Sequence, residues 1–340
     1  MANARVVIAS PSMIDKSRLE KVLATAGGFD IVASATDLST TYLRVEELMP
    51  DFVIISEGIT QVAEYQCMES LFRAVETRVV MLRPSPREID QTGWAAQNKD
   101  CVHPLMPAAD MLNVIKHAAQ HRVANPHMKT GASKPQVQRS IFQQEKMILI
   151  GASTGGIDAL TMILQHFPAD CPPTAIVQHT GQSFSETLVR LLDRNCAAQV
   201  VAAETGLEMQ RGRICLAGGL DGHLVLEQRS QTLCRVVHSA PTSGHLPSVD
   251  ELFLSAQPFA GQVVAALLTG MGRDGANGLM ALRQKGAVTI GQDQATSVVW
   301  GMPRVAYELG AVQYQLALSE IGPALMNFCT ADTAQKRRMG

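Results

Sequence analysis

The sequence predicts two tandem α/β domains, the second a doubly wound, mostly parallel sheet. Three observations predict this: residues 5–122 alternate short apolar runs with amphipathic segments, residues 123–145 are polar and contain Pro, Gly, Ser and Lys, and residues 146–332 return to the alternation. The 340 residues are also enough for two domains. We therefore expect domains over 1–122 and 146–332, joined by a linker over 123–145.

The first domain has short apolar runs typical of buried strands, separated by amphipathic segments typical of helices. The strand candidates are 6–9, 31–33, 52–55 and 78–82, and the helix candidates are 17–26 and 111–120. Short connections between them favour a parallel sheet covered on both faces. This layout resembles the flavodoxin-like receiver domain of response regulators.

The positions that carry phosphoryl chemistry in a receiver differ here. A working receiver has acidic residues after its first strand for Mg²⁺, an aspartate phosphoacceptor ending its third, and a lysine after its fifth. This chain has Ser10, Ser56 and His103 there instead. Glu57 is shifted by one residue, so on a strand it would point to the other side. We expect a pseudo-receiver with no phosphoacceptor, which serves for docking, dimerisation or gating.

The composition excludes several classes of protein. A net charge of −2 and 4% aromatic residues argue against a nucleic-acid surface. No apolar run reaches about 18 residues and the N-terminus lacks a signal-peptide core, so we expect a cytoplasmic protein without membrane insertion. The seven cysteines, none in a C-x-x-C pair, are expected as free thiols. We expect no metal and no cofactor.

The second domain is organised around residues 147–164. An apolar run leads into G-x-S-x-G, and apolar residues at helical spacing follow. Ser153 would be held on a sharp strand-to-helix bend with its hydroxyl exposed, beside the free N–H groups of the helix. The same pattern also fits a structural glycine turn or a phosphate cradle.

Two further predicted strands end in polar side chains. The run 174–178 ends at His179, and the run 262–268 ends in a loop that contains Asp274; another strand follows over 287–291. Carboxyl ends of parallel strands share one edge, so Ser153, His179 and Asp274 would converge as nucleophile, base and orienting carboxylate. Taken singly, His179 also fits a structural histidine, and Asp274 a turn or a cap of the helix over 276–285.

Longer motifs carry a specific resemblance. They are GASTGGIDAL, PADCPPTAIVQH, HLPSVDELF, LLTGMGRDGANGLMALRQKGA and GQDQATSVVWGMPRVAYELGAV. In this order, over about 147–318, they resemble the catalytic domain of bacterial chemotaxis protein-glutamate methylesterases, which also carry a receiver in front. The resemblance implies Ser153 as nucleophile, His179 as base and Asp274 as orienting carboxylate. It also implies the backbone N–H groups of Thr154 and Met271 as oxyanion donors.

The chain departs from the family pattern beside these motifs. Thr180 follows the base where the family has Met-Pro, and Leu246 follows a histidine where the family has arginine. His223 and His238 are expected at the surface or in packing. Trp300 fits a cleft, a core or an interdomain position.

The resemblance implies hydrolysis of glutamyl methyl esters on methyl-accepting chemoreceptors, and glutamine deamidation through the same acyl-serine. The chemosensory kinase and coupling proteins are further candidate partners. Two alternatives remain, a non-catalytic chemosensory scaffold and a small-molecule esterase. A scaffold would not need serine, histidine and aspartate together, so their joint presence favours the methylesterase.

Overall fold

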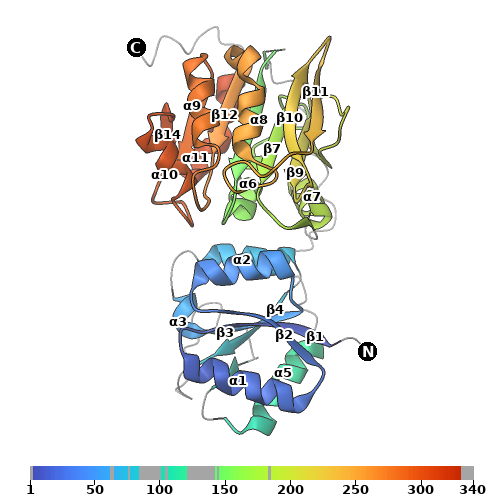
Figure 1. The fold of residues 1–340 in the computed structure, drawn as a ribbon, viewed down its shortest axis with the longest axis vertical. Helices are drawn as coiled ribbons and strands as arrows, with labels where there is room; N and C mark the ends of the chain where they lie inside the picture. Colours follow the sequence, from blue (N-terminus) through green and yellow to red (C-terminus); the bar gives the residue numbers. More distant parts are fainter. Residues whose placement is uncertain are drawn as a thin grey trace. The chain divides into compact units, whose positions relative to one another are not determined.

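The computed structural model describes residues 3–61, 65–75, 77–83, 101–103, 106–120, 142–143, 145–182 and 185–330. The chain divides into two compact units, Met1–Thr130 and Gly131–Gly340 (Figure 1). Most of the predicted linker lies outside the described residues, so its bounds stay a prediction. In the described part, no helix is long and apolar enough to cross a bilayer. The six cysteines whose side chains are described are free, as predicted.

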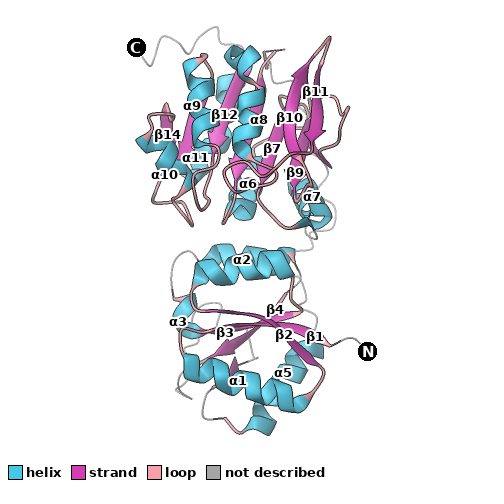
Figure 2. Ribbon diagram, viewed as in Figure 1, coloured by secondary structure: helices cyan, strands magenta, loops and turns pink. Residues whose placement is uncertain are grey.

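The first unit contains a five-stranded parallel sheet in the order β2-β1-β3-β4-β5. Figure 2 shows the labelled strands of this sheet in magenta and the helices in cyan. Its strands are β1 (Ala4–Ala9), β2 (Phe29–Ala35), β3 (Phe52–Ser56), β4 (Arg78–Leu82) and β5 (Cys101–Val102). The buried faces of β1, β3 and β4 are apolar, which accounts for their continuous hydrophobic runs. The flavodoxin-like order predicted from the sequence is therefore confirmed.

The helices of the first unit cover both faces of this sheet. They are α1 (Met13–Ala26), α2 (Leu38–Leu48), α3 (Glu57–Thr60), α4 (Tyr65–Ala74) and α5 (Ala108–Gln120). Figure 1 shows α2 on one face, with α1 and α5 on the other. Helix α1 begins four residues before its predicted start at 17, because the Ser12 hydroxyl accepts the Asp15 N–H at 3.2 Å and caps the helix.

The receiver positions carry no phosphoacceptor carboxylate. Ser56 ends β3, and Ser10 is buried just past β1. The alternation argument used for Glu57 does not apply, because Glu57 begins α3 rather than extending the strand. Its carboxylate lies 3.5 Å from Nε of Arg83, which follows β4.

The second unit contains a seven-stranded sheet in the order β14-β13-β12-β6-β7-β9-β8, with every pair parallel. Its strands are β6 (Met147–Ala152), β7 (Thr174–Gln178), β8 (Gln199–Ala202), β9 (Arg213–Gly218), β12 (Val263–Leu267), β13 (Val288–Gln292) and β14 (Tyr314–Leu316). A separate antiparallel hairpin pairs β10 (His223–Gln228) with β11 (Thr232–Val237).

The helices show that this second sheet is doubly wound, as predicted. They are α6 (Gly156–Leu164), α7 (Ser185–Asn195), α8 (Val249–Ser255), α9 (Ala276–Gln284), α10 (Met302–Glu308) and α11 (Leu318–Cys329), with a 3₁₀ helix, η3, at Gln257–Gln262. The chain passes from β6 to β7 in one direction and from β12 to β13 in the other. Right-handed crossovers therefore put α6 and α9 on opposite faces. In Figure 1, α8 and α9 lie together in front of the sheet.

Strand β6 lies at the centre of this sheet, between β12 and β7. All six of its residues are buried, and the core on the α8–α9 side includes Leu149, Phe253 and Leu279. The carboxyl ends of β6, β7 and β12 therefore meet at one edge, on a rigid support.

Candidate active site

Ser153 lies directly after β6, on the turn that leads into α6. Its N–H donates to the Thr269 carbonyl at 3.0 Å, and its own carbonyl accepts the Gly156 N–H at 2.7 Å. Gly155 has φ +79°, and a Cβ there would lie 2.6 Å from Val298, so this turn needs glycine. The predicted bend is confirmed, but Ser153 is only 6% exposed, so its hydroxyl is less accessible than predicted.

His179 lies at the end of the neighbouring strand β7. The register pairs Ala152 with Gln178, so Ser153 and His179 occupy matching positions just past the two strands. The His179 N–H donates to the Ala152 carbonyl at 3.0 Å. The Gln178 amide nitrogen donates to the carbonyls of Ser153 at 2.9 Å and His179 at 3.0 Å. These bonds tie the two strand ends together.

Asp274 comes from the loop after β12, the strand on the other side of β6. Its Oδ2 lies 2.9 Å from Nε2 of His179, and Asp274 is 0% exposed. The structure therefore brings together two of the three predicted residues in a direct bond and places Ser153 on the adjacent strand end.

The alternative role of Asp274, as a cap of the helix over 276–285, is not observed, because Gly275 rather than Asp274 precedes α9. Asp274 instead accepts four other hydrogen bonds, mainly from the start of α8. The donors are the Ser248 hydroxyl (2.7 Å) and the N–H groups of Val249 (2.7 Å), Asp250 (3.0 Å) and Gly275 (2.9 Å). Asp274 is thus fixed in place independently of His179.

These donors decide the charge of the Asp274 carboxyl group. Burial by itself would raise its pKa, but hydrogen bonds from His179, Ser248 and Asp250 outweigh burial and lower the pKa. The neighbouring Asp250 carboxyl shows the opposite shift: burial raises its pKa, and Asp274 adds to that effect. Asp274 therefore faces His179 as a carboxylate that accepts the imidazole N–H.

The orientation of His179 decides which nitrogen can act as a base. With Nε2–H donating to Asp274, the lone pair is on Nδ1. This Nδ1 is buried and has no partner within the described ranges. Among the described residues, the Ser153 hydroxyl also makes no hydrogen bond, so the serine–histidine bond of a triad is not formed here. Such bonds often tighten only when substrate binds.

Of the two expected oxyanion donors, Thr154 directly follows Ser153, and Met271 follows Gly270, which packs against Ser153. Neither the Thr154 N–H nor the Met271 N–H donates to another group in the described part of the chain. A Cβ on Gly270 would lie 2.7 Å from Cβ of Ser153, and a Cβ on Gly301 would lie 3.3 Å from Cα of Met271. The loop after β12 is therefore packed directly against Ser153 at Gly270, and Gly301, just before α10, packs against the same loop.

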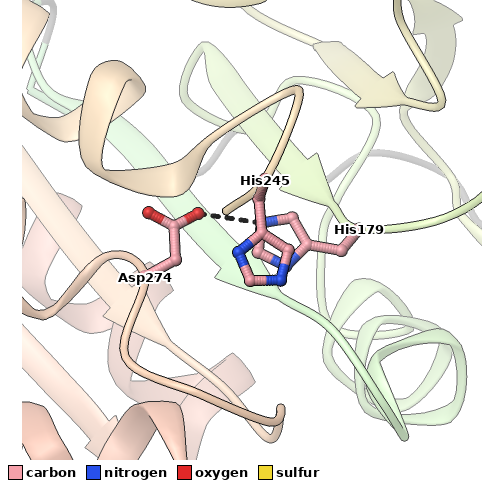
Figure 3. A group of neighbouring side chains, drawn as sticks. All are labelled: His179, His245 and Asp274. Atoms are coloured by element: carbon pink, nitrogen blue, oxygen red, sulfur yellow. Dashed lines mark hydrogen bonds and ion pairs between the residues drawn. The ribbon is translucent and has the colours of Figure 1, made fainter. Parts of the chain in front are cut away.

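His245 is a residue of this site that the sequence did not single out for a role. Its ring stacks on His179, with centroids 3.9 Å apart and planes 5° from parallel (Figure 3). His245 follows no predicted strand, so no periodic pattern marked it. Its place in HLPSVDELF, next to the Leu246 departure, was the available signal.

His179, His245 and Asp274 also have ligand atoms within 4.8 Å of one another, as metal ligands do. A metal ion lies near the plane of each imidazole that binds it, and two nearly parallel stacked planes share no such point. The Asp274 oxygens are already occupied by hydrogen-bond donors. This arrangement does not fit a metal centre.

His223, His238 and Trp300 were the remaining residues that the sequence analysis named near the site. His223 is buried and its Nδ1 accepts the Ser248 N–H at 3.0 Å, so it belongs to packing rather than to the surface. His238 has a side chain that is 68% exposed, as expected for a surface residue. The Trp300 indole N–H donates to the Gln292 carbonyl at 3.3 Å, and the residue is partly buried.

Comparisons with known proteins identify the family of the chain. Residues 148–325 match the family described as CheB methylesterase. The protein-glutamate methylesterase/protein-glutamine glutaminase of Agrobacterium fabrum is 36% identical over 345 residues, which cover 97% of this chain and 98% of that protein. The corresponding protein of Caulobacter vibrioides is 34% identical over 342 residues, with 97% and 99% covered.

A solved structure gives the same result for the second unit. The crystal structure of the Thermotoga maritima CheB methylesterase catalytic domain matches with a TM-score of 0.52 and 33% sequence identity. The match covers 54% of this chain and 98% of that domain. On its sequence, its sheet and the residues gathered at the ends of β6, β7 and β12, the chain belongs to the CheB methylesterase family.

Proposed function

We propose that this chain hydrolyses glutamyl methyl esters of chemoreceptors, with Ser153, His179 and Asp274 as its catalytic triad. The observation that carries the proposal is the 2.9 Å bond between His179 and the buried Asp274, beside a serine at the next strand end. The relatives named protein-glutamate methylesterase/protein-glutamine glutaminase support the same reaction. Glutamine deamidation is included, because an amide can react through the same acyl-serine.

In the first half-reaction, the Ser153 hydroxyl attacks the ester carbonyl and His179 accepts its proton. The free nitrogen is Nδ1, so Nδ1 takes the proton while Nε2–H stays on Asp274. The Asp274 carboxylate holds this tautomer and stabilises the imidazolium that forms. His179 then gives the proton to the departing methoxide, which leaves as methanol.

In the second half-reaction, water cleaves the acyl-serine. His179 takes a proton from the water, the hydroxide attacks the acyl carbon, and the serine oxygen leaves with that proton. The N–H groups of Thr154 and Met271 would donate to the carbonyl oxygen while it carries negative charge. Loss of one such donor typically slows catalysis by about 10² to 10³.

The decisive experiment measures methanol release from methylated chemoreceptor by the wild-type chain and by Ser153→Ala. We expect release by the wild type and a loss of at least about 10⁴-fold in the variant. No release by either chain would favour the scaffold, and release only from small esters would favour the small-molecule esterase. We also propose that the chain acts in the cytoplasm, with the chemosensory kinase and coupling proteins as candidate partners.

A further inference from the structure

His245 touches the proposed base but takes no part in the proton transfers described above. The two rings lie face to face, with centroids 3.9 Å apart, and Asp274 lies at the edge of His179 (Figure 3). The single bond from Nε2 to Asp274 leaves the His179 ring free to turn about that bond. A flat side chain against the ring face removes this freedom.

The His245 ring is itself held in one orientation, and its surroundings favour its neutral form. Its Nδ1 lies 3.0 Å from the Ser243 carbonyl, so Nδ1 carries the proton and Nε2 the lone pair. Burial, and then the neighbouring His179, lower the pKa of His245, against smaller raising effects of Asp274 and the Ser243 carbonyl. A neutral ring can stay stacked when the proposed base becomes an imidazolium, because it adds no like charge.

The loop that carries His245 is braced on both sides. Backbone N–H groups of Thr242 and His245 donate to each other's carbonyls at 3.1 and 2.9 Å. The Thr242 hydroxyl donates to Glu251 at 2.9 Å, and the Ser243 hydroxyl donates to Asp250 at 3.1 Å. These bonds fasten the loop to the first turn of α8.

The same first turn holds Asp274. Ser248 and the N–H groups that follow it donate to the Asp274 carboxylate, and His223 accepts the Ser248 N–H. One continuous segment, residues 242–250, therefore supports His179 on its ring face and holds its acidic partner.

We propose that His245 is a positioning residue, which fixes the His179 ring with Nε2 on Asp274 and Nδ1 towards the nucleophile. This inference rests on the proposed hydrolase function. The stacked ring also covers one face of His179, so water cannot reach the His179–Asp274 bond from that side.

The test compares His245→Ala, His245→Leu and His245→Phe on methylated chemoreceptor. Phenylalanine keeps a flat ring, leucine keeps apolar bulk without one, and alanine removes both. We expect His245→Ala and His245→Leu to lower kcat by about 10- to 100-fold with KM nearly unchanged. A displaced base slows the chemical step but does not weaken substrate binding. Phenylalanine should restore most of kcat. His238→Ala, at an exposed histidine outside the site, is the matched control and should match the wild type.

A second measurement does not depend on turnover. The proton NMR spectrum of the histidine-labelled chain should contain a downfield resonance from the His179 Nε2–H on Asp274. We expect it in the wild type and in His245→Phe, and expect exchange with water to remove it in His245→Ala.

Three outcomes would overturn the proposal. The first is a His245→Ala variant with wild-type kcat and an unchanged resonance. The second is a His245→Phe variant with a kcat as low as that of His245→Ala, and the third is a His245→Ala variant in which only KM rises. If His245→Ala does not fold, the comparison of leucine with phenylalanine decides. If the wild type itself releases no methanol, the proposed function fails, and the resonance still decides whether His245 fixes the ring.

Discussion

At the residue scale, the site depends on two buried carboxyl groups with opposite pKa shifts. Asp274 accepts five hydrogen bonds and Asp250 accepts two, from the Gly278 N–H at 2.7 Å and the Ser243 hydroxyl at 3.1 Å. Hydrogen-bond donors lower the pKa of Asp274. Burial is the largest cause that raises the pKa of Asp250, and the nearby Asp274 is a smaller one. A negative charge on both groups is therefore unfavourable.

This difference predicts the behaviour of Asp250→Asn. Because the folded pKa of Asp250 is raised, this carboxyl contributes stability below its unfolded pKa of about 3.9 and loses that contribution as pH rises through the folded value. An amide at position 250 does not titrate and can still accept the Gly278 N–H. We expect the stability of the variant, relative to wild type, to increase from about pH 4 to about pH 7.

Urea unfolding of both chains at several pH values measures this. Glu204→Gln, a change at an exposed carboxyl, is the control and should show no such trend. A variant whose relative stability falls as pH rises would show that the sign of the Asp250 shift is wrong.

The sequence identified Ser153, His179 and Asp274 for a physical reason that did not extend to His245. Each of the three follows an apolar run that marks a strand, and parallel strand ends converge. His245 lies in a loop, and its stacking on His179 depends on the tertiary placement of residues 242–250. No local pattern records such a tertiary contact.

At the element scale, the sequence predicted some strands closely and missed others. The sequence indicated β4 at its observed residues, 78–82, and β6 as the strand before Ser153. The prediction left out β8, β9 and the β10–β11 hairpin, which lie between 199 and 237. Strands β8, β10 and β11 have mixed burial, whereas β9 is apolar and buried after Arg213, so its run was a usable signal that the prediction did not take up. It also missed α8, because seven residues are too few for a helical period to show.

The turns between elements lead to a further prediction, for Gly270→Ala. The new Cβ would lie 2.7 Å from Cβ of Ser153 and in the space of the Met302 sulfur. To relieve this overlap, either Ser153 or the loop that carries Met271 must move. We expect kcat for methanol release to fall by at least about 100-fold, and the free energy of unfolding to fall by about 1–3 kcal/mol.

The control is Gly261→Ala, where nothing lies within 4 Å of the added Cβ and the backbone is ordinary. It should leave the rate unchanged. A Gly270→Ala chain with wild-type kcat would mean that the approach of this loop to Ser153 does not matter for the reaction.

At the scale of the whole molecule, chain topology brings together residues far apart in sequence. His179 and Asp274 are 95 positions apart, yet β7 and β12 are the two neighbours of β6. The sequence could predict a shared sheet edge but not this order. Strand order is set by how helices pack on both faces, which no single segment encodes.

The first unit has a flavodoxin-like sheet order, and the sequence predicts that it lacks the phosphoryl chemistry of a receiver. This leads to the last prediction. Neither the wild type nor Ser56→Asp should gain an aspartyl phosphate from acetyl phosphate with Mg²⁺. One carboxylate is not enough, because Ser10 stands where metal-binding acids are needed and His103 where a lysine is needed. The Ser10 side chain is also buried, and its hydroxyl accepts the Ser12 N–H at 3.1 Å. Intact-mass measurement tests this, with a phosphorylatable receiver as the control. A phosphoryl adduct on the wild type would contradict the pseudo-receiver assignment. An adduct on Ser56→Asp alone would show that the missing aspartate is the single barrier to phosphorylation.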